Sequence, residues 1–152
     1  MALSSARLLQ LAIPLVKTNG FTREALARSV LTLPETEAHS QPLSDTAVSA
    51  LFGKGDLARA NLIRAWLNDG IKHMRTAPEN SNLQQVLRTR LEFNEPVLAY
   101  LPEAFALLAS SPNGLPVLDP RPALQHSVKI ADEACYLTGD KSLQLGIRGG
   151  AR

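Results

Sequence analysis

The stretch TNGFTREALARSV, residues 18–30, decides how the first part of the chain folds. Asn19 and Gly20 form a pair that ends a helix, because glycine tolerates the left-handed backbone found at helix C-termini. Thr22 is of the residue type that caps helix N-termini, and strong helix formers follow it. The sequence therefore predicts two helices joined by a tight turn.

Helical periodicity continues on both sides of this turn. Before it, apolar residues recur at three- and four-residue steps, at Leu8, Leu11, Ala12, Leu15 and Val16, as on the buried face of a helix. Pro14 lies inside this run and is expected to bend or split the helix. The next helix starts at Thr22 and ends at Pro34, and residues 34–42 form a polar loop framed by prolines.

Further helices are predicted in the rest of the chain. No segment shows the period-two alternation of a β-strand over a useful length, so the sequence predicts an all-α fold. The predicted helices extend from a cap at Ser44 or Asp45 to Gly53, from a cap at Asp56 along an apolar side that reaches Ile71, and over 83–94, 96–109 and 122–138, the last stopped by Gly139.

Composition and charge narrow the classes of function. The 152 residues suit one domain with a real core, and no stretch approaches the ~18 apolar residues of a membrane-spanning helix. The net charge is only +2, with basic residues spread among acidic ones, whereas a dedicated nucleic-acid binder carries a clustered basic face. The single cysteine, Cys135, indicates a reducing compartment and is expected to be a small buried apolar residue.

Candidate catalytic and metal-binding residues form no recognisable set. The fragment GKG at 53–55 lacks the spaced glycines and the Lys-Ser/Thr pair of a phosphate loop, so it predicts a turn between helices. The histidines are far apart in sequence and are expected at the surface: His39, His73 and His126. The acidic residues around the end of the last predicted helix are expected to form a solvated or partner-facing edge: Asp132, Glu133 and Asp140. The sequence predicts no metal site, no cofactor and no enzymatic activity.

The apolar segment 96–109 has two interpretations: a buried core helix, or the wall of a pocket for a long apolar ligand. Helical spacing places four of its side chains on one stripe, Leu98, Leu101, Phe105 and Leu108. The helix over 122–138 offers a second stripe, made of Leu124, Val128, Ala131 and Cys135. We expect the two stripes to confront each other around a lipid, and any open part of them to favour association with a membrane or with another copy of the chain as a homodimer.

Several segments, taken in order, resemble known families. Residues 8–30 and 48–70 resemble the N-terminal helices of TetR-type repressors, which contain a helix-turn-helix. Together with the segments 90–110 and 126–142, they are similar to the ubiquinone-biosynthesis accessory lipid-binding family known as coenzyme Q biosynthesis protein nine. Two motifs carry this similarity, and they stand here as Arg90, Leu91, Asn94, Glu95, Pro96, Pro102, Glu103 and Ala104, and as Asp132, Glu133, Gly139, Asp140 and Ser142.

The resemblance implies a TetR-like helical bundle with a helix-turn-helix-like region at 1–76 and a region at 82–142 that binds lipid and a partner. It implies a non-catalytic protein that holds an isoprenoid lipid or quinone precursor and lies peripherally on the matrix side of the mitochondrial inner membrane. Such a protein presents the precursor to demethoxyubiquinone hydroxylase. By this resemblance Asp132, Gly139 and Asp140 belong to the partner-facing edge.

The chain departs from the family pattern at its end. The family continues into an aromatic segment and further amphipathic helices, whereas this chain gives LQLGIRGGAR, residues 143–152. We therefore expect the C-terminal helices to be missing, residues 143–152 to form a flexible tail, and association with the hydroxylase to be weak.

Two other hypotheses stay open at this point. One is a TetR-like transcriptional regulator, and the other is a helical fragment whose apolar face lacks its covering helices. The candidate recognition helix DTAVSALF, residues 45–52, offers no Arg, Lys, Asn or Gln to read base edges. The sequence therefore predicts a helix-turn-helix-like region that does not bind nucleic acid.

Overall fold

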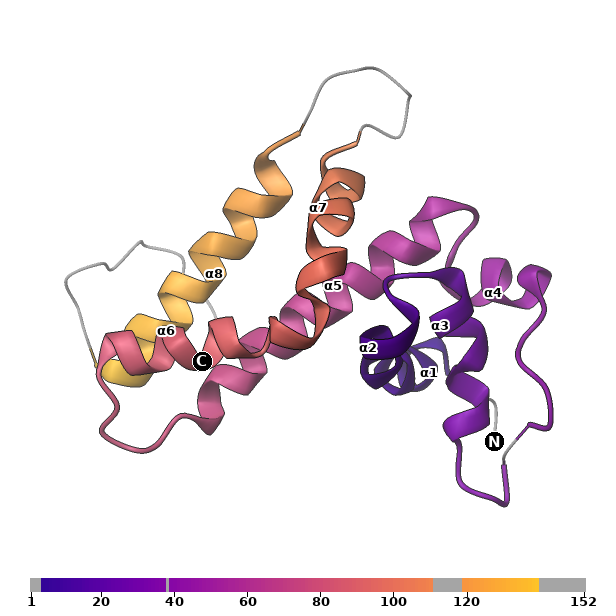
Figure 1. Cartoon of the computed structure of the whole chain (residues 1–152), viewed down its shortest axis with the longest axis horizontal. Coiled ribbons are helices and arrows are strands. Elements are labelled where there is room, and N and C mark those ends of the chain that lie inside the picture. Colours follow the sequence, from indigo (N-terminus) through magenta and orange to yellow (C-terminus); the bar gives the residue numbers. More distant parts are fainter. Residues whose placement is uncertain (1–3, 38, 111–118, 140–152) are drawn as a thin grey trace. The chain divides into compact units, whose positions relative to one another are not determined.

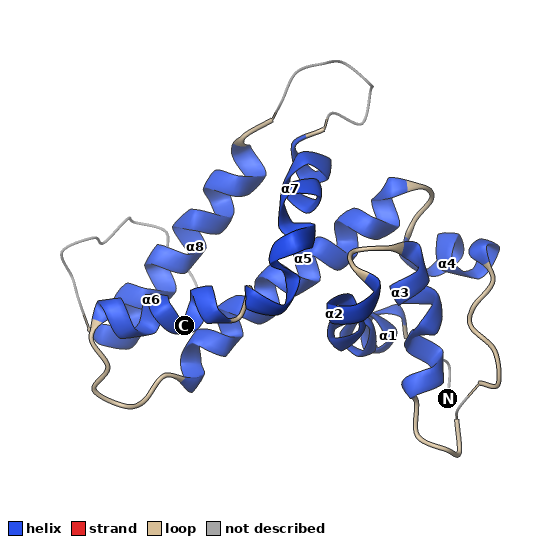
Figure 2. Ribbon diagram, viewed as in Figure 1, coloured by secondary structure: helices blue, strands red, loops and turns tan. Residues whose placement is uncertain are grey.

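The structure is a computed structural model, and it describes residues 4–37, 39–110 and 119–139. Helices and short connections make up this part of the chain, and no strand occurs in it (Figure 2). The predicted all-α class is confirmed for the described residues.

Figure 1 shows the order of the helices along the chain. In chain order they are α1 (Ser5–Ala12), η1 (Ile13–Leu15), α2 (Val16–Asn19), α3 (Arg23–Arg28), η2 (Ser29–Thr32), α4 (Asp45–Phe52), α5 (Asp56–His73), η3 (Met74–Thr76), α6 (Leu83–Glu92), η4 (Glu95–Tyr100), α7 (Leu101–Ala109) and α8 (Arg121–Thr138), where η denotes a 3₁₀ helix.

The turn at 18–30 forms as the sequence predicts. Asn19 is the last residue of α2, and Gly20 after it has a φ of 66°. Thr22 caps α3, since its side chain accepts a hydrogen bond from the backbone N–H of Ala25 at 3.2 Å. Pro14 splits the preceding helix as expected, because a 3₁₀ turn replaces the α-helix around it.

The later helix ends agree with the sequence at most positions. Ser44 caps α4, Gly53 ends it, and Gly139 ends α8 with a left-handed φ of 67°. Asp56 is the first residue of α5 rather than its cap. There its carboxylate lies in the first turn, where the helix dipole favours negative charge.

The predicted single helix over 96–109 is divided into η4 and α7. Pro102 accounts for the break, because it takes the second position of α7, where its missing N–H leaves no helical bond unmade. The prediction of one continuous helix was therefore wrong, although both parts are helical.

Two compact units make up the chain. The first unit comprises Met1–Trp66 and Pro96–Leu108, and the second comprises Leu67–Glu95 and Ala109–Arg152. The units do not follow chain order, since 96–108 joins the N-terminal helices. The α5 helix contributes residues to both.

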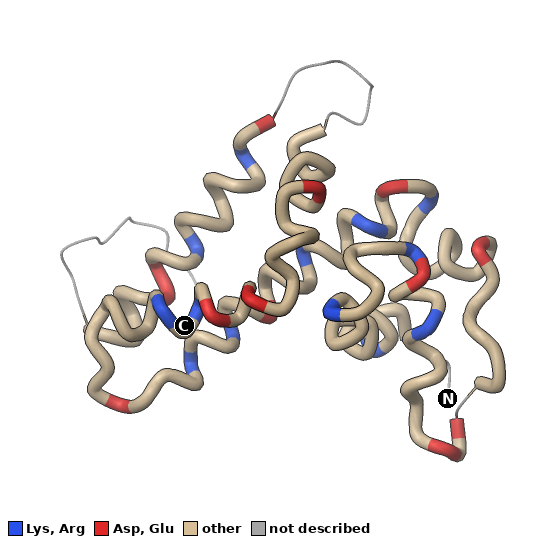
Figure 3. Tube along the Cα trace, in the orientation of Figure 1, with Lys and Arg blue, Asp and Glu red and all other residues tan. Residues whose placement is uncertain are grey.

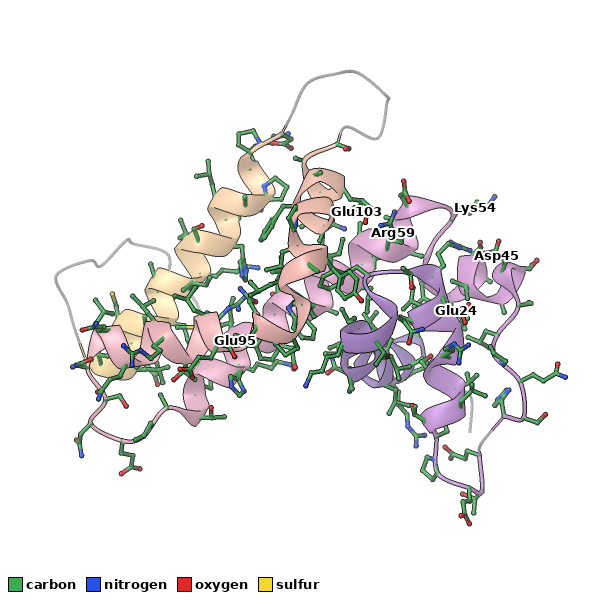
Figure 4. The ribbon with its side chains drawn as sticks, in the orientation of Figure 1. Glu24, Asp45, Lys54, Arg59, Glu95 and Glu103 are labelled. Carbon is green, nitrogen blue, oxygen red and sulfur yellow. The ribbon has the colours of Figure 1, made fainter. Side chains whose placement is uncertain are left out.

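The first unit has an apolar core to which every one of its long helices contributes. Trp66 is buried in this core, with 1% of its surface exposed. The ring of Phe21 packs edge-on against the Trp66 ring at a centroid distance of 5.9 Å. Arg59 of α5 links this helix to two other segments of the unit. It donates to the Phe21 carbonyl at 2.9 Å. It also pairs with Glu103 of α7, and Figure 4 labels these two side chains.

The second unit packs α6 and η3 against α8. Its smaller core contains Met74, Val86 and Ala134 at its centre, with partly buried side chains around them from Ala77, Leu83, Leu87 and Ile130. Helix α6 begins with a capping box, in which the Asn82 side chain accepts from the Gln85 N–H and the Gln85 side chain accepts from the Asn82 N–H.

Candidate functional site

The stripe predicted on 96–109 lies in the first unit and is only partly covered. Leu98 is 60% exposed and Phe105 is 36% exposed, Leu101 is half-buried and Leu108 is buried. The buried face of α7 is formed by Leu108, which belongs to the stripe, and by Ala104, which does not. Leu98 and Phe105 therefore present apolar surface that the core of their own unit does not use.

The stripe predicted on α8 lies in the second unit. Leu124 is 61% exposed, Val128 and Ala131 are half-buried, and Cys135 is buried. The predicted burial of Cys135 is thus confirmed. The neighbouring face of α8, with Ile130 and Ala134, is the one that packs into the core of the unit.

The confrontation of the two stripes stays a prediction. The reason is that the two stripes belong to different compact units. What the structure adds is a distinction within each stripe, between residues already buried and residues still exposed.

The predicted partner edge contains residues of different character. Asp132 is half-buried, Gly139 is exposed, and Asp140 lies outside the described residues. The expectation of a solvated or partner-facing Glu133 was wrong. Glu133 is 5% exposed, and its Oε1 atom accepts a hydrogen bond from Nε of Arg75 at 2.9 Å, which holds α8 to η3.

The expectation of surface histidines holds for His39 and His73 and fails for His126. His39 and His73 are exposed, and the His73 ring packs on Phe93 at a centroid distance of 5.2 Å. His126 is only 9% exposed. The physical reason is a buried partner, since the Nη2 atom of Arg90 lies 3.0 Å from Nε2 of His126.

Arg90 forms a buried polar joint together with His126 and Asn94. Arg90 is 2% exposed and donates through Nη1 to Oδ1 of Asn94 at 2.8 Å. Its guanidinium also lies over the ring of Phe93, with Cζ 5.6 Å from the ring centroid, where a cation is attracted by the π electrons. Both hydrogen-bond acceptors are neutral, and no carboxylate pairs with Arg90 among the described residues.

Gly70 of α5 explains how the guanidinium fits. A Cβ atom on Gly70 would lie 2.7 Å from Cζ of Arg90 and 3.0 Å from Nε. The guanidinium therefore packs directly on the α5 backbone, and its Nε–H, which has no hydrogen-bond acceptor, is enclosed there. Burial lowers the pKa of Arg90, although an arginine stays charged at any ordinary pH.

The protonation state of His126 follows from this geometry. A guanidinium only donates hydrogen bonds, so Nε2 of His126 has to accept, and the ring proton of the neutral imidazole belongs on Nδ1. Burial, and then the positive charges of Arg90 and Lys129, lower the pKa of His126 from 6.5 to about 4. His126 is therefore neutral at neutral pH.

The sequence did contain a signal for the burial of His126. Helical spacing puts it on the same face of α8 as Ile130, Glu133 and Ala134, which are one and two turns further on. The structure buries that face in the second unit. The sequence prediction for His126 rested on the spacing of metal ligands, which carries no information on the burial of this face.

The exposed face of α4 carries no Arg, Lys, Asn or Gln side chain to read base edges. The exposed residues of α4 include Asp45, Thr46 and Ala50. Arg23 of α3, the arginine next to this helix, uses its guanidinium internally. It donates to Oδ1 and the carbonyl of Asp45, to Oγ of Ser49 and to the carbonyls of Gly53 and Gly55, at 2.7 to 3.3 Å. Figure 3 shows basic and acidic residues interspersed along the described trace, without a continuous basic stretch.

No helix among the described residues has the length and apolar character needed to cross a bilayer. Within the same residues, no group of three or more His, Cys, Asp or Glu side chains is arranged to hold a metal ion.

No protein-family model matches the chain, and comparison with curated proteins and with solved structures likewise finds no match. Function therefore has to be inferred from the residues themselves and from the sequence resemblance described above.

Proposed function

We propose that this protein is a non-catalytic lipid-binding accessory protein of ubiquinone biosynthesis. Exposed apolar side chains on η4 and α7, and separately on α8, bind an isoprenoid lipid or quinone precursor. The protein presents that lipid to demethoxyubiquinone hydroxylase at the matrix side of the mitochondrial inner membrane, to which it binds peripherally.

The observation that carries the proposal is the exposure of large apolar side chains on both stripes. Leu98, Phe105 and Leu124 each keep more than a third of their surface in water. Leu98 and Phe105 share one stripe and Leu124 lies on the other, and exposed apolar side chains grouped on one face are typical of a binding site. Each buried CH₂ group of a ligand contributes about 0.8 kcal/mol, so an isoprenoid chain of several units gains binding energy even from a partial groove.

The specific pathway, the partner and the location are supported by the sequence resemblance. The motif that begins at Arg90 and the motif from Asp132 to Ser142 are both present, in the family's order. The same resemblance supports a TetR-like arrangement of the helices, and the capped helices α3 and α4 are compatible with it.

A TetR-like transcriptional regulator is the competing hypothesis. It is disfavoured by the residues exposed on α4, which include no base-reading side chain, and by the internal hydrogen bonds of Arg23. A repressor that contacts several phosphates binds duplex DNA with an affinity that falls steeply with salt. Selection from a random duplex pool that yields a clear motif, with such a salt dependence, would favour the regulator over the lipid carrier.

The direct test measures bound lipid and membrane association together. Native mass spectrometry reports the lipid that copurifies with the protein and the oligomeric state, and flotation with liposomes reports membrane binding. We expect Leu98→Asp and Phe105→Asp to reduce both signals, because each puts a charge into the exposed part of the stripe.

Two control variants separate the stripe from a general effect of added charge. Leu91→Asp makes the same change at a leucine of α6 that is 67% exposed and outside both stripes, and Lys72→Asp changes an exposed charge on α5. Both should retain lipid. If the folded stripe variants bind lipid and liposomes as well as the controls do, the stripes are ordinary surface and the proposal is wrong.

A further inference from the structure

The contact between Arg90 and His126 joins α6 to α8 through a group that can gain a proton. The two side chains are buried and 3.0 Å apart, and the contact requires the lone pair of His126 Nε2. A proton on that nitrogen removes the acceptor and places two cations at hydrogen-bond distance. Like charges this close repel strongly when little water screens them.

Among the residues that the structure describes, the charged groups that act on His126 are positive and do not relieve this repulsion. From α6 the group that faces it is the guanidinium of Arg90, and from α8 itself Lys129 adds a second positive charge. The nearest acid on the same face of α8 is Glu133, two turns away and bonded to Arg75 of η3. On α5, Gly70 packs on Arg90 and the His73 ring packs on Phe93.

We infer that the Arg90–His126 contact is an acid-sensitive joint: when His126 gains a proton, α8 separates from α6. Separation returns both cations to water, where their repulsion is weak. It also uncovers the core face of α8, where Ile130 and Ala134 are packed in the closed unit. Acid therefore breaks the Arg90–His126 contact and exposes the apolar core face of α8.

The pH range of the change follows from where each state takes up the proton. In the closed unit the pKa of His126 is lowered to about 4, whereas in the open unit it returns toward 6.5. The open state therefore binds more protons between these values, and closure weakens as the pH falls from about 6.5 to about 4. By linkage, the equilibrium constant for closure falls on the order of 100-fold over this range.

Nuclear magnetic resonance of the full chain tests the inference directly. The imidazole Cε1–H signals of the three histidines are followed between pH 7.5 and pH 4, and the His126 signal is the one that persists in both His39→Gln and His73→Gln. We expect His126 to titrate well below the ordinary histidine value of 6.5. Hydrogen exchange, expressed as protection factors, should show α8 losing protection as the pH falls.

The variant His126→Gln is also the mechanistic test. A glutamine oxygen can accept from Arg90 but does not titrate in this range, so α8 should keep its protection at pH 4.5. His39→Gln, at an exposed histidine outside the joint, is the control and should open like the parent chain. A normal titration of His126 near pH 6.5 overturns the inference even if His126→Gln does not fold. So does a folded His126→Gln variant whose α8 loses protection as the parent does.

Discussion

A Cβ atom on Gly70 would lie 2.7 Å from Cζ of Arg90, so the α5 backbone and the α6 guanidinium pack in direct contact. Glycine is required here for space, since Gly70 is helical and its φ is not in the left-handed region. This contact encloses a charge that pairs with no carboxylate among the described residues.

Gly70→Ala should therefore destabilise the chain, although alanine is the better helix former. Propensity alone would stabilise a helix by roughly 0.5–1 kcal/mol. Displacing the guanidinium from a packed site costs more, and we expect a net loss of about 1–3 kcal/mol in the free energy of unfolding. Denaturant unfolding followed by circular dichroism measures it. Asn68→Ala, at an exposed position of α5, is the control and should be neutral or stabilising.

Arg90→Met should be tolerated better than Arg90→Lys. Methionine removes a buried charge with no ionic partner, a replacement that is often neutral or stabilising in proteins. Lysine keeps the charge, but its ammonium group cannot reproduce the planar fork that reaches Asn94 and His126. We expect the free energies of unfolding to differ by about 1–3 kcal/mol in favour of methionine. A lysine variant that is as stable as the parent would show that the fork geometry is unimportant.

Local features of this fold could be predicted from the sequence, because they depend on residues close together in the chain. The cap at Thr22, the stop at Gly20 and the split at Pro14 each follow from backbone chemistry within one turn. The division at Pro102 follows from the same chemistry. It was missed because the apolar periodicity of 96–109 continues across it.

The buried polar joint could not be predicted in the same way. Arg90 and His126 are 36 residues apart in sequence, and a buried arginine without an acid is an exception to the usual pairing of buried charges. The burial of Glu133 was not predicted for a related reason, because its partner Arg75 is 58 residues away in sequence. The candidate lipid site was predicted as two stripes, yet only the fold decides which of their residues remain exposed.

Arg23→Lys should loosen the α3–α4 region. The guanidinium contacts groups on α4 and the two glycines of the α4–α5 turn, and a lysine cannot make this set of hydrogen bonds. Hydrogen bonds to charged groups contribute about 1.5–3 kcal/mol each in favourable cases, and the Arg23 side chain is 22% exposed. We therefore expect a net loss of about 2 kcal/mol. Trp66 is the only tryptophan and lies in the first unit, so its fluorescence reports the unfolding there.

The control for this variant is Arg64→Lys. Arg64 is exposed on α5, and its side chain bonds Asn61 of the same helix. This change should leave the free energy of unfolding within about 0.5 kcal/mol of the parent. Equal losses in the two variants would mean that the Arg23 hydrogen bonds contribute nothing specific.

Gly20→Ala should be among the most damaging single changes in the first unit. Gly20 has φ 66° and ψ −171°, a conformation that residues with a Cβ atom rarely adopt, and a Cβ atom there would lie 3.2 Å from the Tyr100 ring. Gly55→Ala is a matched comparison, because Gly55 also has a positive φ, of 55°, but has open space around it. We expect Gly20→Ala to lower the free energy of unfolding by about 2–4 kcal/mol and Gly55→Ala by about 1 kcal/mol. Tyr100→Leu added to Gly20→Ala should recover the part that is due to the ring. Equal losses at the two glycines, with no recovery, would show that the turn at residues 18–30 needs only a positive φ and gains nothing from its contact with η4.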